Sequence, residues 1–137
     1  MAQPTANRRP PPPPASAARL TRVEAERLVR DRPLDAGAYT WLGMLDLEAG
    51  ATEQAIENLR RATFLSPDDA LAQFSLARAY ARLGQHSRAR TALMHARRLL
   101  ASMPDDQTVP GGGGIWAAEL RQAVEAEFAG LARAADR

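Results

Sequence analysis

The sequence predicts an all-α protein built from a repeated pair of helices. Three observations predict this fold. Alanine is abundant and favours helix, and apolar residues recur at three- and four-residue spacings. A shift of the sequence by 34 residues (42 onto 76) brings similar residues into register, which is the mark of a repeat protein. At 137 residues, the chain has room for one domain.

The composition limits the function. The chain contains no cysteine, which excludes disulfides, thiolate metal sites and thiol catalysis. No apolar run approaches the roughly 18 residues that a membrane span needs, so membrane insertion is not expected. The first residues do not resemble a signal peptide either. We therefore expect a cytoplasmic location.

The N-terminal part is expected to divide into a tail and a first helix. Residues 1–15 include five consecutive prolines and predict a disordered Pro-rich tail or linker. The helical domain is expected over residues 16–134, and its first helix over residues 16–31. Pro33 ends that helix, and Asp35 is placed to cap the next one.

Two repeats follow, over residues 36–69 and 70–103. The matched positions in the 34-residue register are the pairs Leu42/Leu76, Gly50/Gly84, Leu59/Leu93 and Leu65/Leu99. The pattern of each repeat predicts a helix, a turn and a second helix. In the first repeat, Gly43 and Ala55 are small residues where two helix backbones must approach closely, because a larger side chain would separate them.

These positions resemble the motif of the tetratricopeptide (TPR) family. In the first repeat the motif positions hold Tyr39, Leu42, Gly43, Asp46, Ala55, Leu59, Ala62 and Pro67. In the second repeat they hold Gln73, Leu76, Ala77, Tyr80, Ala89, Leu93, Ala96 and Ala101. Asp46 replaces the second aromatic of the motif, and the closing proline is missing from the second repeat. The resemblance implies a right-handed helical repeat that binds protein.

Flanking helices complete the expected stack, because such repeats need about three units for stability. The helix before Pro33 resembles the second half of a preceding repeat. Without a closing proline, the second repeat is expected to continue to about Met103, followed by a Gly-rich loop over residues 104–114. A C-terminal capping helix is expected over residues 115–134, with one apolar face made of Trp116, Leu120, Val124, Phe128 and Leu131.

A narrower resemblance covers residues 62–110. This segment is similar to the C-terminal repeat region of bacterial chemoreceptor methyltransferases of the CheR type. The matching stretches are residues 62–67, residues 70–74 and residues 98–101. The resemblance implies an accessory or regulatory module of a chemotaxis-type signal-transduction system, because no residue here suits S-adenosylmethionine. The alternative is a stand-alone adaptor, or a secretion-type chaperone that holds a helix or peptide of another protein.

Other sites are not supported by the sequence. The Gly111–Gly114 run precedes a helix but has no Gly-Lys-Ser/Thr, so a hinge is the better interpretation. His86 and His95 lack a second ligand at helical spacing, and no serine has a nucleophile motif. The few, scattered aromatics argue against nucleic acid. We therefore expect no catalytic residue, metal or cofactor, and a protein that is not an enzyme.

The expected binding surface is a concave groove lined by the first helix of each repeat. Its predicted residues are Thr40, Met44, Leu47, Glu48, Phe74, Arg78, Ala81 and Arg82. An apolar floor beside two arginines suits a protein or peptide that is acidic and has an apolar anchor. Residues 70–103 hold no acidic side chain, so we expect no carboxylate within this repeat to neutralise the two arginines, and Glu48 of the groove to pair with one of them at most. Exposed repeat ends would also permit a homodimer.

Overall fold

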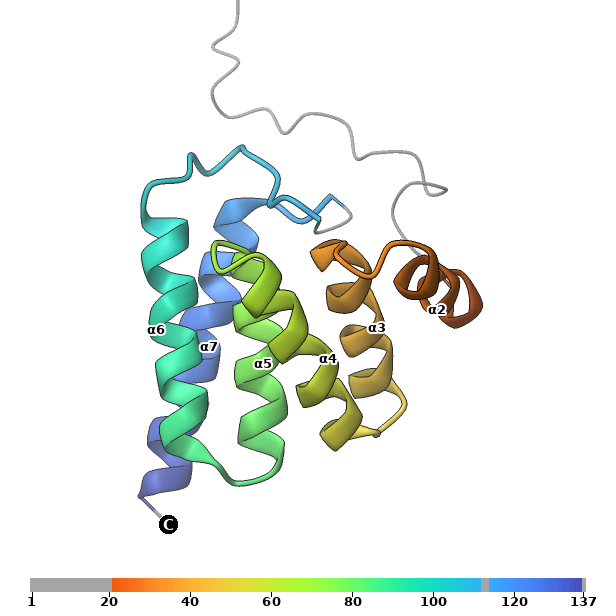
Figure 1. The fold of residues 1–137 in the computed structure, drawn as a ribbon. Helices are drawn as coiled ribbons and strands as arrows, with labels where there is room; N and C mark the ends of the chain where they lie inside the picture. The colour runs from red at the N-terminus through yellow and green to blue at the C-terminus, as the bar shows by residue number, and fades with distance from the viewer. Residues whose placement is uncertain (1–20, 112–113, 137) are drawn as a thin grey trace, which may run out of the picture.

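The structure is a computed structural model that describes residues 21–111 and 114–136. Its helices are α2 (Arg22–Asp31), α3 (Ala36–Glu48), α4 (Thr52–Leu65), α5 (Ala70–Arg82), α6 (His86–Ala101) and α7 (Ala117–Ala135). Figure 1 shows them side by side in chain order, with α7 behind α5 and α6. The tail expected over residues 1–15 and the first turn expected for the first helix lie outside the described residues.

Side-chain caps start three of the helices. The Thr21 hydroxyl accepts from the Glu24 amide at 3.2 Å, and the Glu24 carboxylate accepts from the Thr21 amide at 2.9 Å, which is a capping box. Asp35 caps α3 by accepting from the Ala38 amide at 3.3 Å, as its position before that helix predicts. One repeat later, Asp69 caps α5 in the same way. The two repeats therefore begin with the same local chemistry.

Small residues hold the two helices of the first repeat together. A Cβ atom on Gly43 would lie 2.5 Å from Leu59 Cγ and 3.3 Å from the Ala55 carbonyl oxygen, so α3 and α4 leave no space for a side chain there. Ala55, Leu59 and Ala62 are fully buried along the facing stripe of α4. The close contact predicted from the sequence is present, with Leu59 as its main partner.

The second repeat uses the equivalent positions. Ala77 is buried on α5, and α6 faces it with a buried stripe of Ala89, Leu93 and Ala96. Full burial of a leucine such as Leu93 contributes about 1.5–3 kcal/mol. Gly84 ends the turn between α5 and α6 with φ 73°, as Gly50 does between α3 and α4 with φ 80°. This left-handed backbone favours glycine.

Asp46 occupies a position where the motif has an aromatic residue, and it is buried. Its two oxygens accept hydrogen bonds from Arg22 on α2 and from Asn58 on α4, both at 2.8 Å. A buried carboxylate is tolerated when it is paired in this way. The substitution therefore joins three helices through polar contacts, where an aromatic side chain would have packed.

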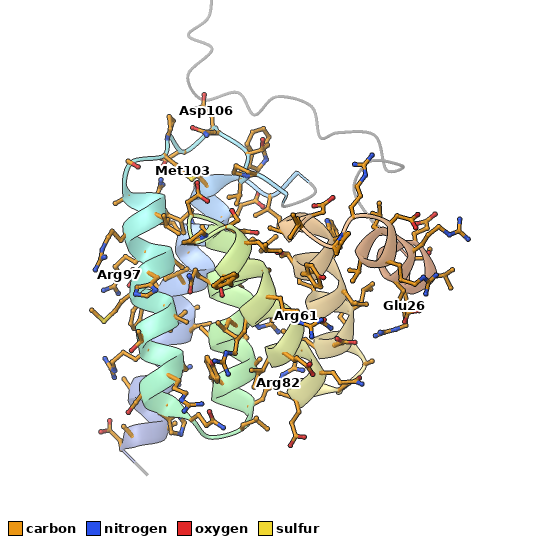
Figure 2. The ribbon with its side chains drawn as sticks, in the orientation of Figure 1. Glu26, Arg61, Arg82, Arg97, Met103 and Asp106 are labelled. Atoms are coloured by element: carbon orange, nitrogen blue, oxygen red, sulfur yellow. The ribbon has the colours of Figure 1, made fainter. Side chains whose placement is uncertain are left out.

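Helix α7 packs against α6 and α5 in the same way that α5 packs against α4 and α3. Arg97 of α6 donates two hydrogen bonds to Glu125, each 2.8 Å long, and its guanidinium lies 3.9 Å from the centre of the Phe128 ring. Figure 2 labels Arg97 on α6, at the left of the view. The arrangement makes α7 the first helix of an incomplete third unit, which closes the end of the stack.

The connection between α6 and α7 is anchored at two points. Val109 is buried in the main core, and its amide donates to the Ile115 carbonyl at 2.8 Å. Arg121 of α7 donates to the Leu100 carbonyl at 2.8 Å, to the Met103 carbonyl and to the Asp105 carboxylate. The guanidinium thus adds a donor to carbonyls at the end of α6, including that of Leu100, which also accepts from the Met103 amide at 3.1 Å. Helix α6 ends at Ala101 and α7 begins at Ala117, each two residues inside the expected bounds.

We predict that Gly43→Ala destabilises the fold. Overpacking against Leu59 costs about 1–3 kcal/mol, whereas the better helix propensity of alanine returns up to about 1 kcal/mol. Urea unfolding followed by circular dichroism should show a lower midpoint. Gly130→Ala is the control, because only Arg133 Nη2 approaches its Cβ position, at 3.8 Å. The control should be neutral or stabilising, and equal behaviour of both variants would contradict the assigned contact.

We also predict that Arg121→Ala weakens the attachment of α7. Loss of hydrogen bonds from a charged donor should lower the free energy of unfolding by about 1.5–3 kcal/mol. Amide hydrogen exchange should increase first in α7 and at the end of α6. Arg133→Ala, on an exposed position of the same helix, is the control and should leave exchange in α6 unchanged. Exchange rates in α7 that stay at the parent level would rule out the capping role.

Candidate functional site: the concave groove

A groove of about 290 Å³ lies along the first helices of the three units. Helix α3 supplies one wall, α5 the floor, and α7 with Ile115, two positions before this helix, the other wall. The lining residues are Met44, Leu47, Glu48, Leu71, Phe74, Ser75, Arg78, Arg82, Ile115, Glu119, Leu120 and Ala123. The groove therefore draws on segments that are distant in sequence, and the repeat spacing brings them together.

Six of the eight residues predicted for the groove line it. Met44, Leu47 and Phe74 contribute apolar surface, with Met44 and Phe74 only partly buried. Glu48 is exposed at its edge. Ala81 packs against the core and is not part of the lining. The apolar side chains point into the groove because they follow helical spacing on the same faces of α3 and α5.

Both arginines have partners, whereas the sequence predicted at most one pairing, with Glu48. Arg78 Nε lies 3.7 Å from Glu127 Oε1 on α7, and its guanidinium lies 5.9 Å from the centre of the Phe74 ring. Arg82 donates to the Leu47 carbonyl at 2.6 Å, near the end of the molecule opposite Met103 (Figure 2). The expectation considered the second repeat and Glu48, whereas Glu127 lies on α7, 49 positions after Arg78 in the sequence (127 against 78).

Thr40 does not line the groove, so that part of the prediction is wrong. The residue is only 2% exposed, and its hydroxyl lies 3.0 Å from Asp69 Oδ2 and 3.1 Å from the Ala36 carbonyl oxygen. Burial raises the pKa of the Asp69 carboxyl, while hydrogen bonds from the Ala72 amide and from Thr40 act in the opposite direction. Thr40 is a structural partner of the α5 cap, because it lies one turn too early on α3 to reach the groove.

The sequence interpretation missed the wall formed by α7. It placed this helix at the end of the stack as a cap and used its apolar face only for the core. Ile115, Glu119 and Ala123 follow four-residue spacing along one side of α7, and all three line the groove. This spacing was a usable signal, since the first helix of every unit faces the same side in a helical repeat.

Within residues 21–111 and 114–136, no group of histidine and acidic side chains is arranged to hold a metal ion. In the same part of the chain, no helix is both long and apolar enough to span a membrane. His86 and His95 are exposed on α6.

Comparison with known proteins identifies the repeats. A family described as "TPR repeat" matches residues 43–84, and one described as "Tetratricopeptide repeat" matches residues 70–99. A search of curated proteins finds no match. The fold is similar to that of PcrH in its crystal structure in complex with the chaperone binding region of PopD. The TM-score is 0.59 at 21% identity, over 78% of this chain and 77% of that chain.

The described residues therefore have the all-helical, TPR-like repeat fold that the sequence predicted, and tetratricopeptide-repeat models match residues 43–84 and 70–99 of the chain. The family matches fall on α3 to α6, which are the two complete helix pairs. The resemblance to chemoreceptor methyltransferases has no counterpart among these matches.

The Thr40 contact predicts a change in the ionisation of Asp69. Thr40→Val removes a donor that stabilises the carboxylate, so the pKa of Asp69 should rise further. A carboxyl whose pKa is raised in the folded state adds stability below its unfolded pKa and loses it as the pH rises through the folded pKa. The variant should therefore lose more stability at pH 7 than below the unfolded pKa. Carboxyl ¹³C NMR titration and urea melts at both pH values measure this.

Thr91→Val is the matched control for that experiment. The Thr91 hydroxyl donates to the carbonyl four residues earlier, at 3.1 Å from Ser87, as a threonine on a helix commonly does. It has no carboxylate partner among the described residues. The pKa of Asp69 should not move in this variant, and a Thr40→Val titration curve identical to the parent would disprove the contact.

Proposed function

We propose that this chain is a non-catalytic protein-interaction module that holds a segment of a partner protein in the concave groove. The observation that carries the proposal is the groove itself, which runs across the first helices of three successive units and has an apolar floor. Met44 and Phe74 are only partly buried there and remain available for contact. A surface made by repetition is extended in one direction and suits a helix or extended peptide.

The volume of the groove favours an anchoring side chain over a whole small molecule. Sites for small ligands usually measure about 300–1,000 Å³ and enclose most of the ligand. This groove, at about 290 Å³, is below that range and open. One or two apolar side chains of a partner segment would fill it. The methionine adds adaptability, because its unbranched thioether can conform to different anchors.

We keep the proposal of an acidic partner but assign charge a smaller share of the binding. Arg78 and Arg82 each use part of their donor set within the protein, but a guanidinium carries five N–H donors. An acidic partner residue would compete with Glu127 for Arg78. We therefore assign most of the affinity to the apolar floor and give charge the smaller part, in the rate of association and in selectivity.

Two cellular contexts are compatible with this function. A secretion-type chaperone or stand-alone adaptor is supported by the fold shared with PcrH, whose crystal structure contains the chaperone binding region of PopD. A role beside a chemoreceptor methyltransferase is supported by the resemblance over residues 62–110. The identity of the captured partner distinguishes them: an exported protein favours the first context, and a receptor or methyltransferase favours the second.

A homodimer would use a different surface. Leu34 and Phe64 are 79% and 85% exposed. They lie away from the groove, so self-association through them would leave the groove accessible to a partner. Sedimentation of the purified chain measures this directly.

We predict that Met44→Glu and Phe74→Ala each weaken partner capture about tenfold or more, as expected for residues at the centre of an interface. The chain would be immobilised and exposed to lysate of its host, and captured proteins would be quantified by mass spectrometry. For Phe74→Ala the loss should persist at high salt, because this variant removes apolar contact and changes no charge. The captured partner would then be purified for direct affinity measurement.

Met94→Glu provides the matched control, since it introduces the same charge change at an exposed methionine on α6, outside the groove. It should capture the same partners in the same amounts as the parent chain. If Met44→Glu and Met94→Glu behave alike while both remain folded, the groove is not the binding site.

A further inference from the structure

A second and larger recess, of about 550 Å³, lies on another side of the molecule between α4, α5 and α6. Figure 1 shows these three helices side by side. The recess is lined by Arg60, Thr63, Gln73, Leu76, Tyr80, Ser87, Arg88, Thr91, Ala92 and His95. It shares none of these residues with the concave groove. The function proposed above does not use it.

The repeat register explains why the recess exists. Gln73 stands where the first repeat has Tyr39, 34 residues earlier. Tyr39 is buried against Ala62, and its ring lies 5.9 Å from the Arg61 guanidinium. Glutamine is shorter than tyrosine and cannot fill the equivalent space in the second repeat. Its amide group therefore replaces a ring, and it faces an open recess.

Two largely buried side chains of the recess keep their polar atoms open to it, because no fully buried polar atom of the described residues lacks a partner. Gln73 is only 7% exposed and Tyr80 only 8%. Within the described part of the chain, neither the Gln73 amide nor the Tyr80 hydroxyl forms a side-chain hydrogen bond. Buried polar groups are normally satisfied, and unsatisfied ones commonly face a ligand or water. These two side chains provide donors at the base of a site that is open to solvent.

The rim of the recess is cationic. Arg60, Arg88 and His95 surround it, and none of the three forms an ion pair with a described residue. Arg88 lies over the Tyr80 ring at 5.9 Å and donates a long hydrogen bond, 3.3 Å, to Gln85. The hydroxyls of Thr63, Ser87 and Thr91 add further donors, and no acidic side chain of the described chain lines the recess.

Ser87 and Arg88 also belong to the first turn of α6, where the helix dipole and free amides favour an anion. The helix end alone would not define a site. Here it coincides with two guanidiniums and with the buried amide and phenol groups at the base. Each of these groups provides positive charge or hydrogen-bond donors, and each therefore favours an anion in the recess.

We propose that this recess binds a small phosphate-bearing molecule. Guanidinium groups bind phosphate oxygens through paired N–H donors, and hydroxyl and amide donors can complete the set. The recess is large enough for a group attached to the phosphate, because its volume lies in the usual range for small-molecule sites. Phosphate in the recess would connect α4 to α6 through Arg60 and Arg88. Binding would therefore stabilise the second repeat.

NMR titration of the full chain tests the proposal. Inorganic phosphate, pyrophosphate and adenosine diphosphate would be added separately, and the side-chain amide signals of Gln73 followed together with the backbone of Ser87. Saturable shifts at these positions are expected, with pyrophosphate or the nucleotide binding more tightly than phosphate. Tightest binding by the nucleotide would indicate a nucleotide-type ligand, and equal binding of all three would indicate that only the phosphate group is recognised.

Variants give the second measurement. Arg88→Gln should weaken pyrophosphate binding about tenfold, the loss expected for a hydrogen bond to a charged group. Arg90→Gln is the control, because Arg90 is exposed on the same helix and does not line the recess. Shifts that do not saturate, or equal weakening by both variants, would show an adventitious ion only and overturn the proposal. Met44→Glu should bind pyrophosphate normally, which separates this outcome from a failure of the proposed groove.

Discussion

The close approach of paired helices through small residues is the contact on which the rest of the structure depends. Gly43 meets Leu59 with no space for a Cβ atom, and Ala77 and Ala89 are buried at the equivalent level of the second repeat. Because these backbones lie close together, each pair has a fixed shape. The first helices of successive units then face the same side and form the groove.

The two repeats differ where their motif positions differ, and the differences have physical consequences. Asp46 replaces an aromatic and connects α2, α3 and α4 through Arg22 and Asn58. Gln73 replaces another aromatic and leaves a recess with a cationic rim. A repeat scaffold tolerates such changes because each unit contacts only its neighbours. Departures from the motif therefore give each repeat contacts and surfaces of its own.

Charge is distributed between units in a way that affects both proposed sites. The second repeat has no acidic side chain, so its arginines take partners from elsewhere or remain without one. Arg78 and Arg97 pair with Glu127 and Glu125 of α7. Arg88 faces the recess without a carboxylate partner in the described structure. Helix α7 thus neutralises Arg78 in the groove and Arg97 at the end of the stack, whereas the arginines of the recess keep their positive charge.

The sequence by itself determined the helices, their pairing and the repeat register. These features are local or periodic, and caps such as Asp35 and the spacing of Leu59 and Leu93 are visible in one dimension. It also located six residues of the groove, because the first helix of each unit exposes the same face. The resemblance to chemoreceptor methyltransferases remains a prediction.

Only the tertiary structure decided which partners distant side chains find. Glu127 on α7 pairs with Arg78 on α5, and the Thr40 hydroxyl lies 3.0 Å from Asp69. Val109 is buried in the core and anchors a loop that the sequence predicts as a hinge. Contacts of this kind depend on how the helices pack against one another, which no local pattern encodes. The recess at Gln73 is likewise an empty volume between three helices, and it becomes visible only when they are packed.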